Sequence, residues 1–139
     1  MNIEKTQFFD LLKIKHEVHF DKRGFFKEAF LYEYLDKNLS YKFNYCQENI
    51  VKSKRNVLRG LHYQLEPYSQ SKLISVEIGK ILDISVDMRR QSKTFGKYFS
   101  YILSSDNHES LFIPKGFAHG YLTISDEAII SYKVDNYYN

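Results

Sequence analysis

The pattern of apolar and polar positions along the chain predicts short strands rather than long helices. Residues 72–78 alternate apolar and polar side chains imperfectly but are rich in β-branched residues, which favours a strand. Residues 81–88 indicate a second strand, and Gly79-Lys80 between the two is typical of a turn, so the pair predicts a β-hairpin. Further apolar segments predict three more strands, at 95–103, 111–113 and 128–134.

One segment, residues 30–37, is the best candidate for a helix, because it is rich in Leu, Tyr, Glu and Lys and contains no breaker. Many short strands separated by turns favour an all-β antiparallel sandwich or barrel with a few short helices. So few helices argue against a doubly wound α/β fold. The chain has no repeat, linker or low-complexity stretch, so we expect residues 1–139 to form a single domain.

The amino-acid composition indicates what kind of ligand the protein could bind and where in the cell it could act. The 12 Tyr and 11 Phe suit strands and could also stack on a base or a sugar. A net charge of +3 does not suggest a nucleic-acid-binding domain but suits a single anionic ligand such as a diphosphate. The single Cys46 excludes an internal disulfide and a cysteine-based zinc site. Residues 1–6 lack the apolar core of a secretory signal and no apolar run has the length of a membrane span, so we expect a cytoplasmic protein.

The first chemical motif is the segment from Val57 to Gln64, read as VLRGLHYQ. The neutral imidazole of His62 can accept a proton near pH 7, and the permanent charge of Arg59 suits phosphate. On a regular strand these two side chains would point to opposite faces, so they share a site only if the strand bends or bulges, which Gly60 permits. An ordinary strand histidine is the alternative, but the neighbouring Arg, Gly and Gln, with Lys72 further on, favour a functional site.

Two further motifs each admit a functional and a structural interpretation. The spacing Pro-x-Gly-x-x-His at residues 114–119 predicts a tight turn that delivers His119 onto the next strand, although a surface histidine on a hairpin fits equally well. Tyr132 in a pocket could protonate a carbon atom, but tyrosines are common in strands. Residues 20–28, with alternating charges around Arg-Gly, predict an exposed hairpin.

Taken together and in this order, these segments resemble the dTDP-4-dehydrorhamnose 3,5-epimerase family, whose fold is a cupin-like jelly roll. The resemblance runs from about residue 20 to residue 138. The matching motifs are Asp21-x-Arg23-Gly24-x-Phe26, Gln47-x-Asn49, Leu58-Arg59-Gly60-Leu61-His62-Tyr63-Gln64, Val86-Asp87-Met88-Arg89, Ser92-x-Thr94-Phe95-Gly96-Lys97, Ile113-Pro114-x-Gly116-Phe117-Ala118-His119-Gly120 and Tyr132-Lys133. They specify the family more closely than the substrate or the stereochemical outcome.

The resemblance implies an isomerase that epimerises a dTDP-4-keto-6-deoxyhexose at C3 and C5 without a cofactor, in the synthesis of rhamnose and surface polysaccharides such as O-antigen. His62 would remove the proton next to the keto group, and Tyr132 would return one to the opposite face. Lys72 would stabilise the enolate oxygen, as an oriented cation does in a pocket poor in water. Asp83 lies near the position of the family's buried pocket aspartate.

The resemblance also implies substrate-binding residues for the diphosphate or sugar, the pocket wall, the nucleotide and the base. Arg59 and His119 would hold the diphosphate or the sugar, and Gln47 and Asn49 would line the pocket. Arg23, Phe26 and Glu28 would reach the nucleotide, and Tyr138 would stack on the base. In this family the nucleotide-contacting set typically comes from the neighbouring subunit. We therefore expect a homodimer, in which pairing could also cover the exposed sheet edges of a sandwich.

Cupins often bind metal, so the ligand set has to be weighed. Their sites usually combine a His-x-His pair with an acidic residue and a later histidine, whereas this chain has His62-Tyr63-Gln64. Only His62 and His119 remain as evident ligands, which is a thin set for a transition metal. We expect no metal.

The chain departs from the family pattern near its end. Family members normally continue beyond the position of Tyr138 with a segment that carries an aspartate, which orients the catalytic histidine, whereas this sequence ends at Asn139. Residues 133–137 also differ from the usual Lys-Thr-Thr-Asp-Tyr. Three explanations for this departure compete. The sequence is part of a longer chain, or another carboxylate such as Asp83 orients His62, or the protein binds its ligand without efficient turnover.

Three other functions stay open from the sequence. A C3-only epimerase would use the same groups. A 3,4-ketoisomerase is disfavoured because the short cupins that perform that reaction show His-x-His where this chain has His-x-Gln. A degenerate sugar-nucleotide-binding module is disfavoured because His62, Lys72 and Tyr132 are all present.

Overall fold

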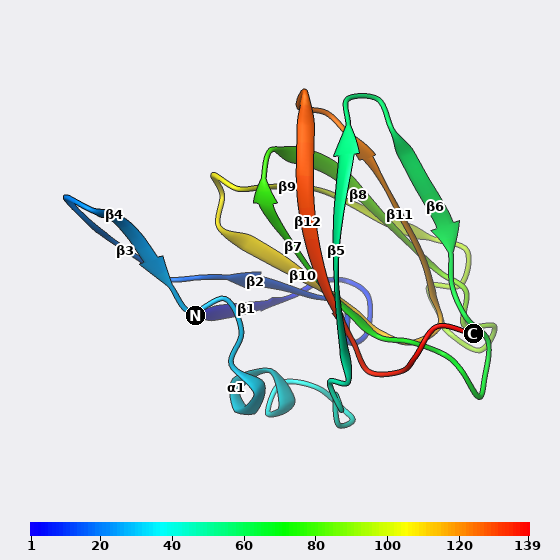
Figure 1. Ribbon diagram of the computed structural model, residues 1–139. Helices are drawn as coiled ribbons and strands as arrows, with labels where there is room; N and C mark the ends of the chain where they lie inside the picture. The colour runs from blue at the N-terminus through cyan, green and yellow to red at the C-terminus, as the bar shows by residue number, and fades with distance from the viewer.

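The computed structural model describes residues 1–139 and is built almost wholly from strands (Figure 1). Its elements are β1 (Asn2–Lys5), β2 (Leu12–Lys15), β3 (Val18–Asp21), β4 (Gly24–Lys27), α1 (Tyr32–Asp36), β5 (Gln47–Lys54), β6 (Leu58–His62), β7 (Lys72–Ile78), β8 (Lys80–Asp87), β9 (Tyr98–Ser104), β10 (Glu109–Ile113), β11 (Phe117–Thr123) and β12 (Glu127–Val134). None of its helices has the length and apolar character needed to cross a membrane.

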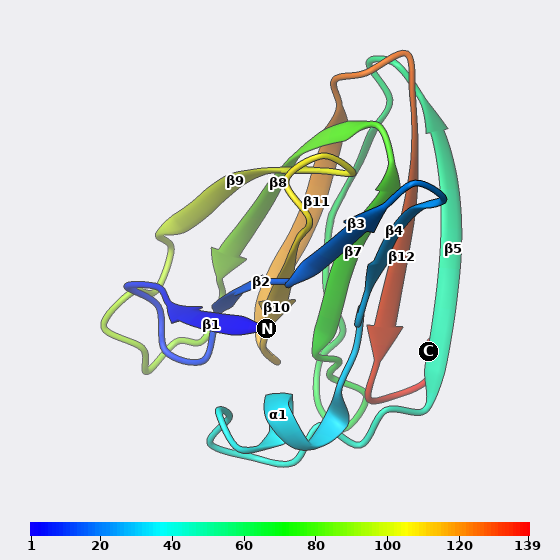
Figure 2. The same ribbon diagram turned by 90° about the vertical axis from the view of Figure 1, so that its left-hand side faces the viewer.

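Two antiparallel sheets form a sandwich. One has six strands in the order β1-β2-β10-β7-β12-β5, and the other has four in the order β6-β11-β8-β9. The β3–β4 hairpin belongs to neither sheet and projects from the body of the molecule (Figures 1 and 2). The predicted all-β class is confirmed, and the architecture is that of a cupin-like jelly roll.

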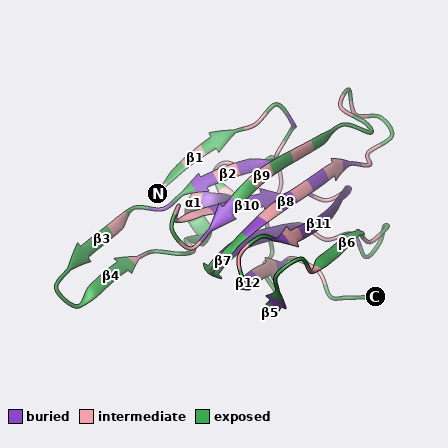
Figure 3. Cartoon of the chain, turned by 90° about the horizontal axis from the view of Figure 1, so that it is seen from above, coloured by how far each residue is buried: buried purple, intermediate pink, exposed green.

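The hydrophobic core explains why the strand pattern is imperfect in sequence. The inner faces of both sheets meet in a cluster that includes Ile74, Ile81, Leu111 and Ile113. A second cluster, with Leu73, lies on the outer face of the six-stranded sheet where α1 and the loop after it cover that face. Part of β7 is therefore buried on both faces, which removes the simple alternation. Figure 3 shows the buried residues concentrated in these central strands and the β3–β4 hairpin exposed.

Most predicted elements are present. Strands at 111–113 and 128–134 correspond to β10 and β12, and the helix lies within residues 30–37. The predicted strand at 95–103 begins three residues later, because the preceding loop is tied back to Asp87. Ser92 Oγ and Thr94 Oγ1 donate hydrogen bonds to Asp87 Oδ2 at 2.7 and 2.6 Å.

The predicted hairpin of residues 72–78 with 81–88 is wrong. The two strands are present as β7 and β8, but they lie in different sheets, so the chain crosses the sandwich between them. Gly79, at φ +83°, makes this crossing, and a Cβ atom there would overlap the carbonyl oxygen of Glu127. Local sequence predicts that two segments are strands, but it does not specify the sheet that each one joins.

Candidate active site

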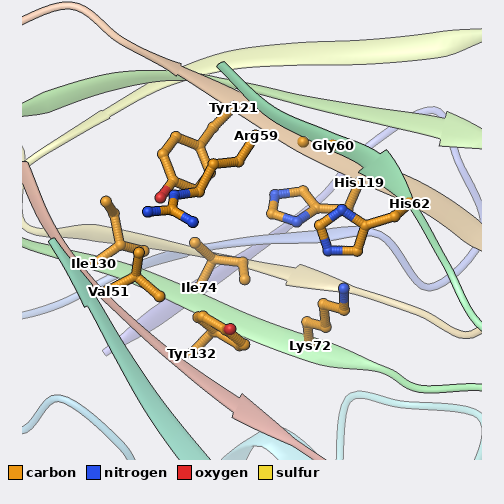
Figure 4. A pocket seen from close by; sticks show the side chains of 11 residues that line it. Val51, Arg59, Gly60, His62, Lys72, Ile74, His119, Tyr121, Ile130 and Tyr132 are labelled. Carbon is orange, nitrogen blue, oxygen red and sulfur yellow. The ribbon is translucent and has the colours of Figure 1, made fainter. Parts of the chain in front are cut away.

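A cavity of about 370 Å³ lies between the two sheets and gathers five of the twelve predicted site residues (Figure 4). Its lining residues are Val51, Arg59, Gly60, His62, Lys72, Ile74, His119, Gly120, Tyr121, Ile130 and Tyr132. A second cavity of about 470 Å³ adjoins it, sharing His62, Lys72 and Tyr132. The other residues of this second cavity are Gln47, Asn49, Tyr63, Gln64, Gln70, Tyr138 and Asn139.

A bulge in β6 brings Arg59 and His62 to the same cavity. His62 pairs with His119 and Arg59 with Tyr121, so β6 uses one residue more than β11 over the same length. Gly60 makes this possible at φ +88°, where its Cα lies so close to β11 that a Cβ atom would overlap His119 O and come within 2.8 Å of Gly120 Cα. The predicted bend at Gly60 is confirmed.

We expect the Gly60→Ala substitution to lower the free energy of unfolding by about 3 kcal/mol, because it adds an overlap with β11 to a left-handed backbone. Gly96→Ala is the matched control, since Gly96 also has a positive φ (+75°) but no atom lies within 4 Å of its added Cβ. That control should lose only about 1 kcal/mol. Urea denaturation of both variants measures the difference, and equal losses would contradict the close approach.

His62 lies at the mouth of the cavity with a neutral imidazole. His62 is exposed, whereas Lys72 and His119 in the same cavity are buried, and its side chain makes no hydrogen bond within the chain. Partial burial lowers the pKa of His62 below its ordinary 6.5, and the charges of Lys72 and His119 lower it further. The unprotonated imidazole therefore predominates at neutral pH.

Lys72 begins β7 and supplies a cation inside the cavity. The residue is only 8% exposed and forms no ion pair. Burial lowers the pKa of Lys72, and the nearby Asp83 carboxylate opposes that shift. Figure 4 shows the side chain extending from its strand toward the wall that carries His62.

Tyr132 faces His62 across the cavity. Tyr132 lies on β12 of the six-stranded sheet, whereas His62 lies on β6 of the four-stranded sheet (Figure 4). Burial raises the pKa of Tyr132, with a further contribution from Tyr121 and an opposing one from Arg59. Its hydroxyl is therefore protonated at neutral pH, and the two sheets present a neutral imidazole and a protonated phenol to opposite sides of the same space.

Asp83 pairs with His119 rather than with His62. His119 Nε2 and Asp83 Oδ2 are 2.6 Å apart, and the carboxylate is fully buried. The alternative in which Asp83 orients His62 is wrong because β11 lies between β6 and β8 in the sheet. The side chain of His119 therefore reaches this carboxylate, and Asp83 fixes His119 in the cavity wall.

Sequence reasoning missed the groups that orient Arg59. Arg59 Nε donates to Ser53 Oγ at 3.0 Å, and that hydroxyl is also 3.0 Å from the hydroxyl of Tyr121. Nothing local distinguishes Tyr121 from the other eleven tyrosines, and Ser53 lies in a strand without a recognisable motif. Their contact depends on the pairing of distant strands.

The remaining predicted residues divide into two groups. Gln47 and Asn49 line the second cavity, where Gln47 Nε2 donates to Asn49 Oδ1 at 2.8 Å, and Tyr138 lies at its edge. Arg23, Phe26 and Glu28 are not brought to the cavity of their own chain. They lie on or beside the β3–β4 hairpin and are exposed.

The exposed hairpin predicted at residues 20–28 is confirmed. At its tip Arg23 is held by Asp21, with 2.6 Å between Nη2 and Oδ2. Nowhere in the chain do three or more His, Cys, Asp or Glu side chains gather closely enough to hold a metal ion.

The fold and the cavity define a class of protein: a cupin-like jelly roll with a cavity lined by ionisable side chains between its sheets. A family model described as dTDP-4-dehydrorhamnose 3,5-epimerase matches residues 5–139. A protein of that name from Shigella flexneri is 45% identical over 139 residues, which are 100% of this chain and 77% of the relative. The chain belongs to the dTDP-4-dehydrorhamnose 3,5-epimerase family.

Solved structures agree with this assignment. The dTDP-4-dehydrorhamnose 3,5-epimerase from Bacillus anthracis, with TDP and PPi bound, matches at a TM-score of 0.94 and 41% identity, over 99% of this chain and 79% of that one. The dTDP-6-deoxy-D-glucose-3,5-epimerase from Legionella pneumophila, in complex with dTDP-4-keto-L-rhamnose, gives the same TM-score and identity. That match covers 99% of this chain and 73% of the other.

Proposed function

We propose that this protein converts dTDP-4-dehydro-6-deoxy-D-glucose to dTDP-4-dehydro-L-rhamnose by inverting C3 and C5. Membership of the family supports the reaction. The observation that carries the mechanism is the placement of His62 and Tyr132 on opposing walls of one cavity, with Lys72 also lining it. Inversion of a carbon centre requires a proton to leave one face and another to arrive on the opposite face.

Each inversion is a two-step proton transfer. The neutral imidazole of His62 takes the proton from the carbon beside the keto group, and the C–H electron pair forms the C=C bond of an enolate. The ammonium group of Lys72 stabilises the enolate oxygen in the partly dry cavity. When the carbonyl reforms, the electron pair takes the hydroxyl proton of Tyr132 on the other face. No electron leaves the sugar, so the step needs no redox partner.

The remaining cavity residues suit the charged part of the substrate. The guanidinium of Arg59 is held in place by Ser53, and His119 is held by Asp83, so both side chains are ordered before a ligand arrives. Such pre-ordering reduces the entropy that binding has to overcome. We assign Arg59 and His119 to the diphosphate or the sugar, and the second cavity to the nucleotide end.

The β3–β4 hairpin supports a homodimer with a shared nucleotide site. Phe20, Phe25 and Phe26 are 71%, 55% and 65% exposed, an unusual amount of aromatic surface for one short hairpin. A neighbouring subunit could cover this aromatic surface, and Arg23 and Glu28 of the hairpin would then lie at the second cavity of that neighbour. Sedimentation equilibrium should give twice the mass of the chain, and Arg23→Ala should weaken dTDP binding without changing that mass. A monomeric mass would contradict the shared site.

The pH dependence of kcat/KM should report the lowered pKa of His62. Only the neutral imidazole can accept the proton, so the rate should stay constant on going down to pH 6.5 and then fall tenfold per pH unit below the depressed pKa. A pH–rate profile from pH 4.5 to 8 with dTDP-4-dehydro-6-deoxy-D-glucose measures the midpoint. A midpoint above 6.5 would contradict the assignment of an uncharged, partly buried base beside Lys72.

The identity of the product tests the proposed function. The protein is incubated with dTDP-4-dehydro-6-deoxy-D-glucose in H₂O, and the ring proton couplings of the product are read by NMR. Inversion at both C3 and C5 is expected. Inversion at C3 alone would instead identify a C3 epimerase, a keto group at C3 would identify a ketoisomerase, and an unchanged but bound sugar would identify a binding module.

A further inference from the structure

The amide of Gln64 fastens the segment that follows β12 to the edge of the second cavity. Gln64 Oε1 accepts a hydrogen bond from the backbone N–H of Asn139 at 2.9 Å. Gln64 Nε2 donates to the carbonyl oxygen of Tyr137 at 3.0 Å and to that of Tyr68 at 2.5 Å. One side chain thus brackets the backbone on both sides of Tyr138.

Two contacts hold the same segment further upstream. The backbone N–H of Ser71 donates to Asp135 Oδ1 at 2.7 Å, and Gln70 Nε2 donates to the carbonyl oxygen of Asn136 at 2.6 Å. Asp135 is fastened a second time by Lys115, whose ammonium group is 3.6 Å away. Residues 135 and 136 are therefore anchored independently of Gln64, whose own hydrogen bonds reach the backbone of residues 137 and 139.

Tyr138 is the residue whose position this arrangement decides. Its side chain is 85% exposed and makes no hydrogen bond, so no packing inside the chain holds it. It nevertheless lines the second cavity together with His62 and Lys72. The Gln64 hydrogen bonds therefore hold the backbone that carries Tyr138 at the cavity edge.

We propose that Gln64 is a positioning residue for nucleotide recognition, which holds Tyr138 at the rim of the second cavity so that the ring can stack on the base of a nucleoside diphosphate. The inference rests on the proposed function and deepens it, because it assigns a residue of the His-x-Gln motif to the nucleotide end of the site. An amide suits the task since it offers a donor and an acceptor side by side to a peptide backbone. Ordering the ring before the ligand arrives increases affinity without adding a contact.

The test combines Gln64→Met with Tyr138→Ala in a double-mutant cycle. Methionine keeps the length of the side chain and adds no charge, but it removes the hydrogen bonds to residues 68, 137 and 139. The measurements are the dissociation constant of dTDP by calorimetry, and KM and kcat with the sugar nucleotide. Gln91→Met is the matched control, because Gln91 is exposed and remote from both cavities.

Gln64→Met is expected to weaken dTDP binding and raise KM by about tenfold while kcat changes less than about twofold. In the Tyr138→Ala background the same substitution should change dTDP binding less than about twofold, because Gln64 acts on the base only through the ring of Tyr138. An equal loss in both backgrounds, unchanged binding, or a fall in kcat with KM unchanged would overturn the inference. Failure of the unsubstituted protein to bind dTDP would instead overturn the proposed function itself.

Discussion

Replacement of His62 by alanine is expected to lower kcat by about 10³-fold, the largest loss of any single substitution in the cavity. The reason is that in the proposed mechanism His62 is the base on the wall formed by β6, and the facing wall offers only the protonated hydroxyl of Tyr132. His119 cannot take over, because its Nε2 is engaged by Asp83 at 2.6 Å. Single-turnover kinetics with dTDP-4-dehydro-6-deoxy-D-glucose give the size of the effect.

Binding supplies the control for this substitution. The His62→Ala variant should bind dTDP within about threefold of the unsubstituted protein, because Arg59, Gln47 and Asn49 are untouched. A large loss of dTDP affinity would mean that the substitution disturbs the fold of β6. Turnover within tenfold of normal would contradict the assignment of His62 as the base.

Removal of the Tyr132 hydroxyl should separate proton removal from inversion. In Tyr132→Phe the ring still packs in β12, but the group that protonates the second face is gone, so epimer formation should fall by about 10²-fold or more. His62 and Lys72 are intact, so the enolate should still form and be reprotonated from the side of His62. The unconverted sugar should therefore exchange hydrogen for deuterium in D₂O with its configuration retained.

Tyr98→Phe is the matched control for Tyr132→Phe. Tyr98 is 65% exposed, makes no side-chain hydrogen bond and lies on β9, away from both cavities. Its loss of a hydroxyl should leave the rate unchanged. Epimerisation at the normal rate by Tyr132→Phe would contradict the two-sided mechanism, and so would the loss of all exchange.

Much of the site could be predicted because its residues lie in compact motifs. The bend at Gly60 could be inferred from the need for Arg59 and His62 to share a site, and the turn at residues 114–116 places His119 on β11 as expected. These features depend on backbone geometry within a few residues, and glycine and proline in the sequence report it directly.

The contacts that could not be predicted are those between strands distant in sequence. Asp83 was one candidate for the carboxylate that orients His62, but the order β6-β11-β8 gives it His119 as a partner. The prediction of a β7–β8 hairpin failed for the same reason, since β7 pairs with β10 and β12 whereas β8 pairs with β11 and β9. Strand order depends on the packing of the whole sandwich, which local patterns do not encode.

Deuterium incorporation tests the central claim, two-sided proton transfer between His62 and Tyr132, most directly. The unsubstituted protein, His62→Ala and Tyr132→Phe are each incubated with dTDP-4-dehydro-6-deoxy-D-glucose in D₂O, and the sugar protons are followed by NMR. The account predicts inverted product with deuterium at C3 and C5 for the unsubstituted protein, exchange with retention for Tyr132→Phe, and neither for His62→Ala. Inverted product that carries no deuterium, or exchange by His62→Ala at the normal rate, would contradict it.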